Sequence, residues 1–105
     1  MASNGSQNRS ECGVEKTLKI IGSKWTMLLL HNLFEGRKRF GELERSLTGI
    51  SPKTLSLRLR ELEKAGIINK KVFAEVPLHV EYTLTARGKS LEVMFKKMAE
   101  WGDKT

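Results

Sequence analysis

The sequence predicts a mainly helical domain that carries one small β-hairpin. Apolar residues recur at helical spacing over residues 12–64, the pattern changes to alternation over residues 67–84, and a helical pattern returns after residue 85. A chain of 105 residues is long enough for one domain. The expected order is four helices, two strands and a last helix, all within residues 12–105.

The first two predicted helices follow an N-terminal segment of a different composition. Residues 1–11 are rich in Ser and Asn, with no apolar pattern, and are expected to form a disordered tail. A first helix is predicted over residues 12–21 and a second, apolar on more than one side, over residues 24–34. One face of the first helix carries Val14, Leu18 and Ile21.

Two helices joined by a short linker are predicted over residues 40–47 and 51–64. Ser51 suits the N-cap of the second of these helices, and Pro52 suits its first turn. A Gly-containing linker between two such helices is typical of a helix-turn-helix. The buried face of the second helix is expected to carry Leu55, Leu59 and Leu62.

A hairpin follows directly, with strands predicted over residues 67–76 and 80–84 and a Pro-containing loop between them. Thr85 is expected to cap the last helix. A hairpin after a helix-turn-helix predicts a winged helix-turn-helix. The apolar face of the last helix carries Leu91, Met94, Phe95, Met98 and Trp101.

The charge is concentrated in the middle of the chain. The formal net charge is +7, and residues 36–71 alone hold ten basic and four acidic residues. A focused basic patch favours a polyanionic partner, and double-stranded DNA is the first candidate. On a helical wheel of residues 51–64, the face opposite the leucines carries Lys53, Leu57, Arg60 and Lys64.

Basic and hydroxyl side chains on this face can bond phosphates or base edges, and Leu57 can meet a thymine methyl group. The alternative interpretation of Leu57 is a stray leucine on the surface of the helix. The alternative interpretation of His79 is an ordinary exposed loop histidine. The predicted DNA contacts are Arg37, Lys38, Arg39, Ser51, Lys53, Thr54, Ser56, Leu57, Arg58, Arg60, Lys70, Lys71 and His79.

The faces of the first and last helices have no obvious partner within one chain, which predicts a homodimer. The predicted contacts are Val14, Leu18, Leu91, Phe95, Met98 and Trp101. No nucleophile motif, phosphate loop or metal-ligand spacing is present, so the sequence predicts no enzyme, no cofactor and no metal site.

Cys12 is the single cysteine, so no disulfide can form within the chain. It is open to three interpretations: a small apolar residue, an incidental surface thiol, or a sensor of oxidants or electrophiles. The chain has neither a signal peptide nor an apolar run of membrane-spanning length, and the expected location is the cytoplasm.

Several segments together resemble the HxlR-type winged-helix regulators, in the neighbourhood of the MarR-like repressors. They are the cysteine before the first helix, residues 21–26, 39–43, 50–56, 58–63, 75–77, 80–85, Gly88 and 101–102. The resemblance implies a homodimer on a pseudo-palindromic operator, joined through its first and last helices. In several members of that family, the cysteine at the position of Cys12 senses oxidants or electrophiles. The resemblance therefore favours the sensor interpretation of Cys12.

The chain departs from the family pattern at two places. Ser23 stands where glycine is usual, and Leu78-His79 stand where the hairpin often carries proline and arginine. Neutral histidine is a weaker anchor than arginine in the negative minor groove. The sequence therefore predicts a DNA-binding transcriptional regulator with room for a small-molecule or oxidant effector. The alternative is a winged-helix protein-interaction module, against which the basic middle third argues.

Overall fold

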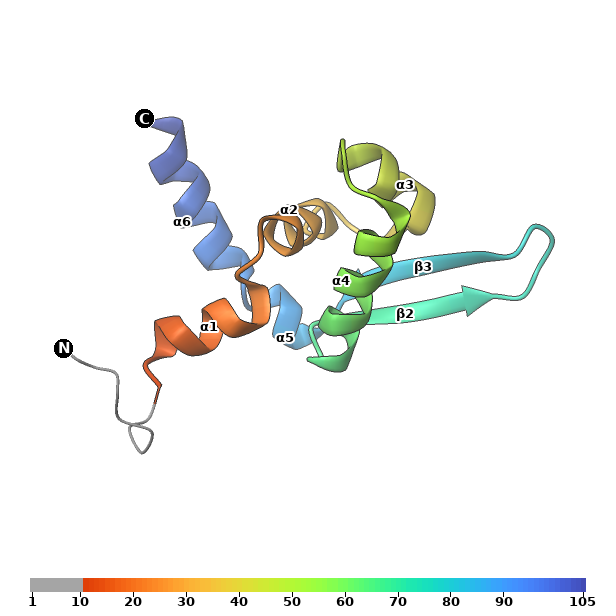
Figure 1. The fold of residues 1–105 in the computed structure, drawn as a ribbon, viewed down its shortest axis with the longest axis horizontal. Coiled ribbons are helices and arrows are strands. Elements are labelled where there is room, and N and C mark those ends of the chain that lie inside the picture. The colour runs from red at the N-terminus through yellow and green to blue at the C-terminus, as the bar shows by residue number, and fades with distance from the viewer. Residues whose placement is uncertain (1–10) are drawn as a thin grey trace.

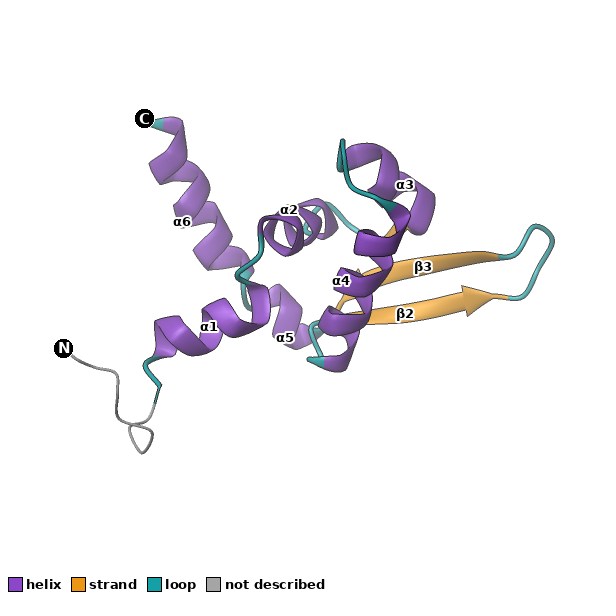
Figure 2. Cartoon of the chain, viewed as in Figure 1, coloured by secondary structure: helices purple, strands orange, loops and turns teal. Residues whose placement is uncertain are grey.

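The computed structural model describes residues 11–105, so the predicted disordered tail lies, except for Glu11, outside the described residues. It confirms the mainly helical class and the order of the predicted elements (Figure 2). The helices are α1 (Gly13–Ile21), α2 (Lys24–Leu33), α3 (Phe40–Ser46), α4 (Pro52–Lys64), α5 (Ala86–Lys89) and α6 (Glu92–Asp103). The strands are β1 (Lys38–Arg39), β2 (Ile68–Phe73) and β3 (His79–Leu84).

The elements divide the molecule into two ends and a centre (Figure 1). Helices α1 and α6 diverge at one end, where the C-terminus lies, and the β2–β3 hairpin extends from the other end. Helices α2, α3 and α4 lie between them. The molecule is elongated, with extents of 57 × 36 × 27 Å.

The core lies at the centre, under α4. Leu55, Leu59 and Leu62 are buried, as predicted, and pack with Leu29 and Leu30 of α2 in one cluster. Burial of each of these leucine side chains favours folding by about 1.5–3 kcal/mol. It also fixes which side of α4 faces away from the protein.

The sheet contains one strand that the sequence pattern does not predict. Its order is β1-β3-β2, and all pairs are antiparallel. Strand β1 is formed by two residues of the basic run, with Lys38 opposite Tyr82 and Arg39 opposite Glu81. Two residues carry too little periodicity to be recognised, and the strand exists only because β3 lies beside it. Strand β2 is shorter than predicted, because it ends at Phe73, and β3 is one residue longer, because it begins at His79.

The single predicted last helix is two helices, α5 and α6, separated by Ser90 and Leu91. Gly88 explains why α5 lies so close to the chain before β2: a Cβ at this position would be 2.2 Å from the carbonyl oxygen of Ile67. Ser90 bonds back to the carbonyl of Arg87 through its hydroxyl. These local contacts end α5, and α6 runs in a different direction from α5 (Figure 1).

Thr85 joins three segments through one hydroxyl. It accepts a hydrogen bond from the Gly88 N–H at 3.0 Å and lies 2.6 Å from the Gly66 carbonyl oxygen. Replacing Thr85 by valine keeps the shape and removes these bonds, so we expect a loss of about 1–2 kcal/mol of unfolding free energy. Urea denaturation measures it. Thr83→Val, at an exposed position of β3, is the matched control and should change stability by less than about 0.5 kcal/mol.

Candidate nucleic-acid interface

Helices α3 and α4 are joined by a turn that places the start of α4 at the surface. Gly49 adopts a φ of 94° in this turn, a conformation that side-chain-bearing residues rarely take. The Ser51 Oγ accepts a hydrogen bond from the Thr54 N–H at 3.1 Å, which caps α4. The Ser51 hydroxyl also donates to the Thr54 hydroxyl at 3.0 Å, so both predicted contact residues help to begin the helix.

The outward face of α4 is the one that the helical wheel predicts. Lys53, Leu57, Arg60 and Lys64 are exposed, opposite the three buried leucines. Leu57 remains 40% exposed, and no core contact accounts for an apolar side chain there. We call these four residues the reading face. It combines three cations with one apolar group on a helix 13 residues long.

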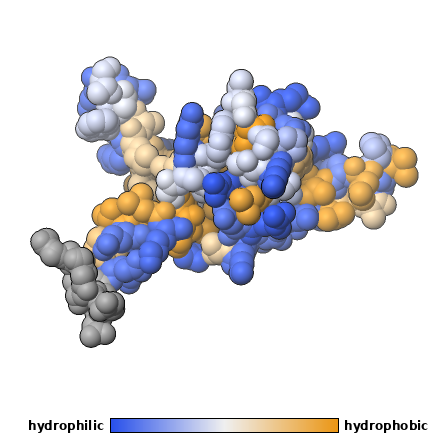
Figure 3. Space-filling view, in the orientation of Figure 1, coloured by the Kyte–Doolittle hydropathy of each residue, from blue (hydrophilic) through white to orange (hydrophobic). Residues whose placement is uncertain are grey.

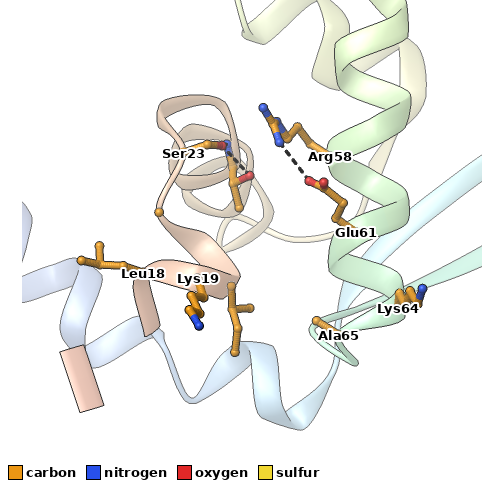
Figure 4. A pocket seen from close by; sticks show the side chains of 10 residues that line it. Leu18, Lys19, Ser23, Arg58, Glu61, Lys64 and Ala65 are labelled. Carbon is orange, nitrogen blue, oxygen red and sulfur yellow. Dashed lines mark hydrogen bonds and ion pairs between the residues drawn. The ribbon is translucent and has the colours of Figure 1, made fainter. Parts of the chain in front are cut away.

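Arg58 is among the predicted DNA contacts, but it does not lie on the reading face. Its Nη1 donates to Glu61 Oε1 at 3.0 Å, and its Nε is buried without a partner among the described residues. It points toward α2, into a pocket of about 530 Å³ between the α1–α2 junction and α4 (Figure 4). At 100° per residue, Arg58 lies about 60° to 70° from the centre of the leucine face, which places it on the flank of α4.

The basic run before α3, residues 37–39, makes some of its polar contacts within the protein. Lys38 is mostly buried and pairs with Glu35 at 2.9 Å. Arg37 is exposed and lies 3.7 Å from Glu81, and Arg39 is exposed with its N–H bonded to Glu42. Arg37 and Arg39 therefore remain available at the surface, and Lys38 does not.

On the hairpin, the two lysines and the histidine have different surroundings. Lys70 and Lys71 are exposed on β2. The His79 side chain is only 13% exposed and stacks on Phe73, with ring centroids 4.6 Å apart and nearly parallel planes. Its ring nitrogens lie 3.3 Å from Glu81 and 3.6 Å from Glu75. The structure thus places His79 inside the hairpin and not at its free tip.

Arg45 is a basic residue near this surface that sequence reasoning missed. It is exposed on α3 and, with Arg39, borders a pocket of about 430 Å³ between α3 and the hairpin. Phe40 and Leu78 also line this pocket. This pocket forms because the start of β3 lies beside α3, and a linear pattern gives no signal for that contact.

Cys12 is exposed and is the N-cap of α1. Its Sγ accepts a hydrogen bond from the Glu15 N–H at 3.4 Å, and its own N–H donates to Glu15 Oε1 at 3.0 Å. This backbone hydrogen bond from Cys12 is the main reason that the pKa of the Glu15 carboxyl is lowered. A reaction at Sγ would therefore disturb the first turn of α1.

The faces of α1 and α6 form an apolar groove, and Figure 3 shows hydrophobic residues over α1 and α6. Val14, Leu18 and Met98 line this groove of about 520 Å³, together with Met27 and Met94. Trp101 is 74% exposed. Phe95 differs from the prediction: it is buried in its own chain, 5.1 Å from Phe34, and Leu91 is partly buried beside it.

Within residues 11–105, no helix is long and apolar enough to cross a membrane. The same part of the chain holds no group of three His, Cys, Asp or Glu side chains that could ligate a metal ion. Exposed basic side chains are concentrated on α4 and β2, where they are Lys53, Arg60, Lys64, Lys70 and Lys71.

Known proteins with this arrangement are regulators. The chain is 46% identical over 93 residues to the uncharacterized HTH-type transcriptional regulator YdeP of Bacillus subtilis (strain 168), covering 89% of this chain and 73% of YdeP. The structure matches the redox regulator HypR in its oxidized form with a TM-score of 0.84 and 44% identity, over 90% of this chain and 97% of that one.

A MarR-family transcriptional regulator from Porphyromonas gingivalis W83 matches with a TM-score of 0.88 and 36% identity, over 95% of this chain and 98% of that one. The model of the HxlR-like helix-turn-helix family matches residues 20–105. The resemblance noted in the sequence is thereby confirmed, together with the winged-helix fold. The chain belongs to the HxlR-like helix-turn-helix family and is a transcriptional regulator of the helix-turn-helix type.

Proposed function

We propose that the chain binds a pseudo-palindromic operator as a homodimer, with α4 in the major groove. The reading face carries this proposal, because three exposed cations and Leu57 stand opposite the helix face that the core holds. Lysine and arginine on such a face reach phosphates and guanine edges, and an apolar side chain meets thymine methyl groups. Lys70, Lys71, Arg37 and Arg39 supply further phosphate contacts.

The apolar α1–α6 groove supports the homodimer. Val14, Leu18, Met98 and Trp101 are large apolar side chains that one chain leaves exposed, and an exposed apolar patch of this kind marks an interface. Two-fold symmetry would place two α4 helices about 34 Å apart, one turn of DNA. HypR is a redox regulator and YdeP is an HTH-type transcriptional regulator, and both relatives support a regulatory role for this chain.

Selection of bound sequences from a random DNA pool tests this function directly. We expect an enriched site with two half-sites in inverted orientation, about one helical turn apart. The alternative, a protein-interaction module with this fold, predicts no enrichment above the input pool. It also leaves the concentration of cations on α4 and β2 without a use, and for this reason we favour DNA binding.

We further propose that Cys12 responds to oxidants or electrophiles. Its thiol is exposed, it caps α1, and the next residues, Gly13 and Val14, line the groove of the proposed dimer. Diamide can join two thiols as a disulfide, taking up their two protons and two electrons. Either such a bridge between subunits or capping by a small thiol changes the α1 contact and so the placement of the two α4 helices. HypR, described as a redox regulator, is a relative at 44% identity.

Diamide is therefore expected to change operator affinity of the wild type about tenfold, roughly 1.4 kcal/mol, and to leave Cys12→Ser unchanged. Serine retains a hydroxyl that can cap α1, so the variant should fold normally. Fluorescence anisotropy with labelled operator measures both proteins before and after treatment. Equal responses of wild type and Cys12→Ser, or no response in either, would reduce Cys12 to a structural cap.

A further inference from the structure

A cavity of about 530 Å³ lies where α1 turns into α2, beside the C-terminal half of α4 (Figure 4). Sites for small molecules in proteins usually have volumes of about 300–1,000 Å³. The wall of this cavity combines apolar side chains, among them Leu18 and Ile20, with the hydroxyl-bearing Ser23 and Thr26. Neither the reading face nor the α1–α6 groove accounts for a partly polar hollow at this place.

Arg58 points into this cavity with part of its hydrogen-bonding capacity unused (Figure 4). Its Nη1 donates to Glu61 Oε1 at 3.0 Å, whereas its Nε is buried without a partner among the described residues. A buried donor without a partner costs about 1–3 kcal/mol, so a ligand that supplies an acceptor removes this cost. The edge formed by Nε and Nη2 matches two oxygens of an oxyanion, and rotation of the long side chain turns that edge toward the cavity.

Cations outnumber carboxylates around the cavity. Lys19, Arg58 and Lys64 line it, together with the carboxylate of Glu61. Lys19 also pairs with Glu11, which does not line the cavity. The first turn of α2 lies on the same wall and adds the positive end of a helix dipole. The electrostatic field in the cavity therefore favours an anion.

We propose that this cavity binds a small organic phosphate monoester. A phosphate group has three terminal oxygens in a tetrahedral arrangement. Two of them suit the Nε–Nη2 edge of Arg58, and the third is left for Lys64 or the first turn of α2. A carboxylate has two oxygens in one plane and is satisfied by the arginine alone. The apolar wall of Leu18, Ile20 and Ala65 suits the organic part of the ligand, which inorganic phosphate lacks.

The position of the cavity connects its ligand to DNA binding, a step that rests on the proposed function. Leu18 lines both this cavity and the α1–α6 groove, and Lys64 lines the cavity and belongs to the reading face. A phosphate bound here attracts Lys64 and places negative charge beside α4, so it should lower operator affinity. Because coupling between two binding sites is reciprocal, the operator should lower the affinity for the phosphate by the same factor.

The ligand site is tested on the full chain without DNA. Phenyl phosphate, benzoate and inorganic phosphate are titrated into isotopically labelled protein at constant ionic strength, and NMR follows the Arg58 Nε–H and the Ser23 backbone N–H. Phenyl phosphate should shift both signals until the site is saturated, and the other two anions should bind at least about fivefold more weakly.

Two variants of Arg58 test its role through the Ser23 signal. Arg58→Gln should weaken phenyl phosphate at least about tenfold, and Arg58→Lys, which keeps the charge but loses the fork, several-fold. Arg45→Gln is the matched control, because it removes the same charge from α3, outside the cavity, and should bind as the wild type does. No saturable shift up to about 10 mM phenyl phosphate, or equal affinity of Arg58→Gln and wild type, would overturn the site. Equal affinity for benzoate would overturn the choice of phosphate.

A second measurement compares operator affinity with and without saturating phenyl phosphate. Wild-type affinity should fall about threefold to tenfold, and that of Arg58→Gln should not respond. An equal fall in both proteins would show competition by the anion at the reading face, and would overturn the coupling but not the cavity. A wild-type chain that selects no DNA would remove the proposed function and the coupling, whereas the titration without DNA decides the cavity on its own.

Discussion

Replacing both Lys53 and Arg60 by alanine is expected to lower operator affinity about 100-fold, roughly 2.7 kcal/mol. Both side chains are exposed on the reading face, and neither has an ion-pair partner among the described residues. An arginine with two hydrogen bonds to a guanine contributes about 1–3 kcal/mol, and a lysine on a phosphate adds a salt-dependent part. The folded state should be unaffected, because neither side chain contacts the core.

The salt dependence separates the two roles. Lys53→Ala alone should make the slope of log affinity against log salt shallower by about one per subunit and weaken all sequences alike. Arg60→Ala alone should relax the preference at one base pair of each half-site. Titrations at several salt concentrations, on the selected operator and on single-base variants of it, measure both.

A Lys96→Ala/Lys97→Ala protein is the matched control, because it loses the same charge from α6, far from the reading face (Figure 1). If general attraction of a basic protein to DNA explained binding, the two double variants would lose similar affinity. A small loss in the control and a large loss in Lys53→Ala/Arg60→Ala is the result expected for direct contact. Wild-type affinity of the latter would contradict the assignment of α4.

The sequence predicts the parts of this surface that depend on local periodicity. The spacing of the leucines determines which side of α4 is buried. Once that side faces the core, the opposite side must face solvent. Ser51 and Pro52 fix where α4 begins for equally local reasons. Fold class and the reading face could thus be predicted without coordinates.

Features that depend on contacts between distant segments could not be predicted. Whether a basic side chain is free depends on its neighbours in space. Lys38 lies opposite Tyr82 of β3 and pairs with Glu35, and His79 lies between Phe73 and two glutamates. Phe95 shares a helical face with Met98 but reaches Phe34 of the core, because α5 and α6 meet at an angle. No periodicity in the chain encodes these three outcomes.

The largest effect is expected when the α1–α6 groove is made polar. Met98 lines this groove and is exposed in one chain, so an aspartate in its place is harmless to the monomer. In a dimer the same carboxylate would be buried in an apolar contact without a partner, which is costly. We therefore expect Met98→Asp to sediment as a monomer at micromolar concentrations at which the wild type is a dimer.

Loss of the dimer should lower operator affinity by about 100-fold to 10,000-fold, because each half-site is then bound without the gain from linking two reading faces. Val93→Asp is the matched control: it adds the same charge to the opposite, solvent-facing side of α6 and should leave assembly and affinity unchanged. Circular dichroism of both variants checks that the helices are retained.

The spacing of the operator provides a second, independent measurement of the same interface. Inserting five base pairs between the half-sites turns them to opposite sides of the duplex, since one turn takes about 10 base pairs. Wild-type affinity should then fall toward that of Met98→Asp, and Met98→Asp should bind the original and the lengthened operators equally. If Met98→Asp remains a dimer, or if the wild type ignores the insertion, α1 and α6 do not set the distance between the two α4 helices.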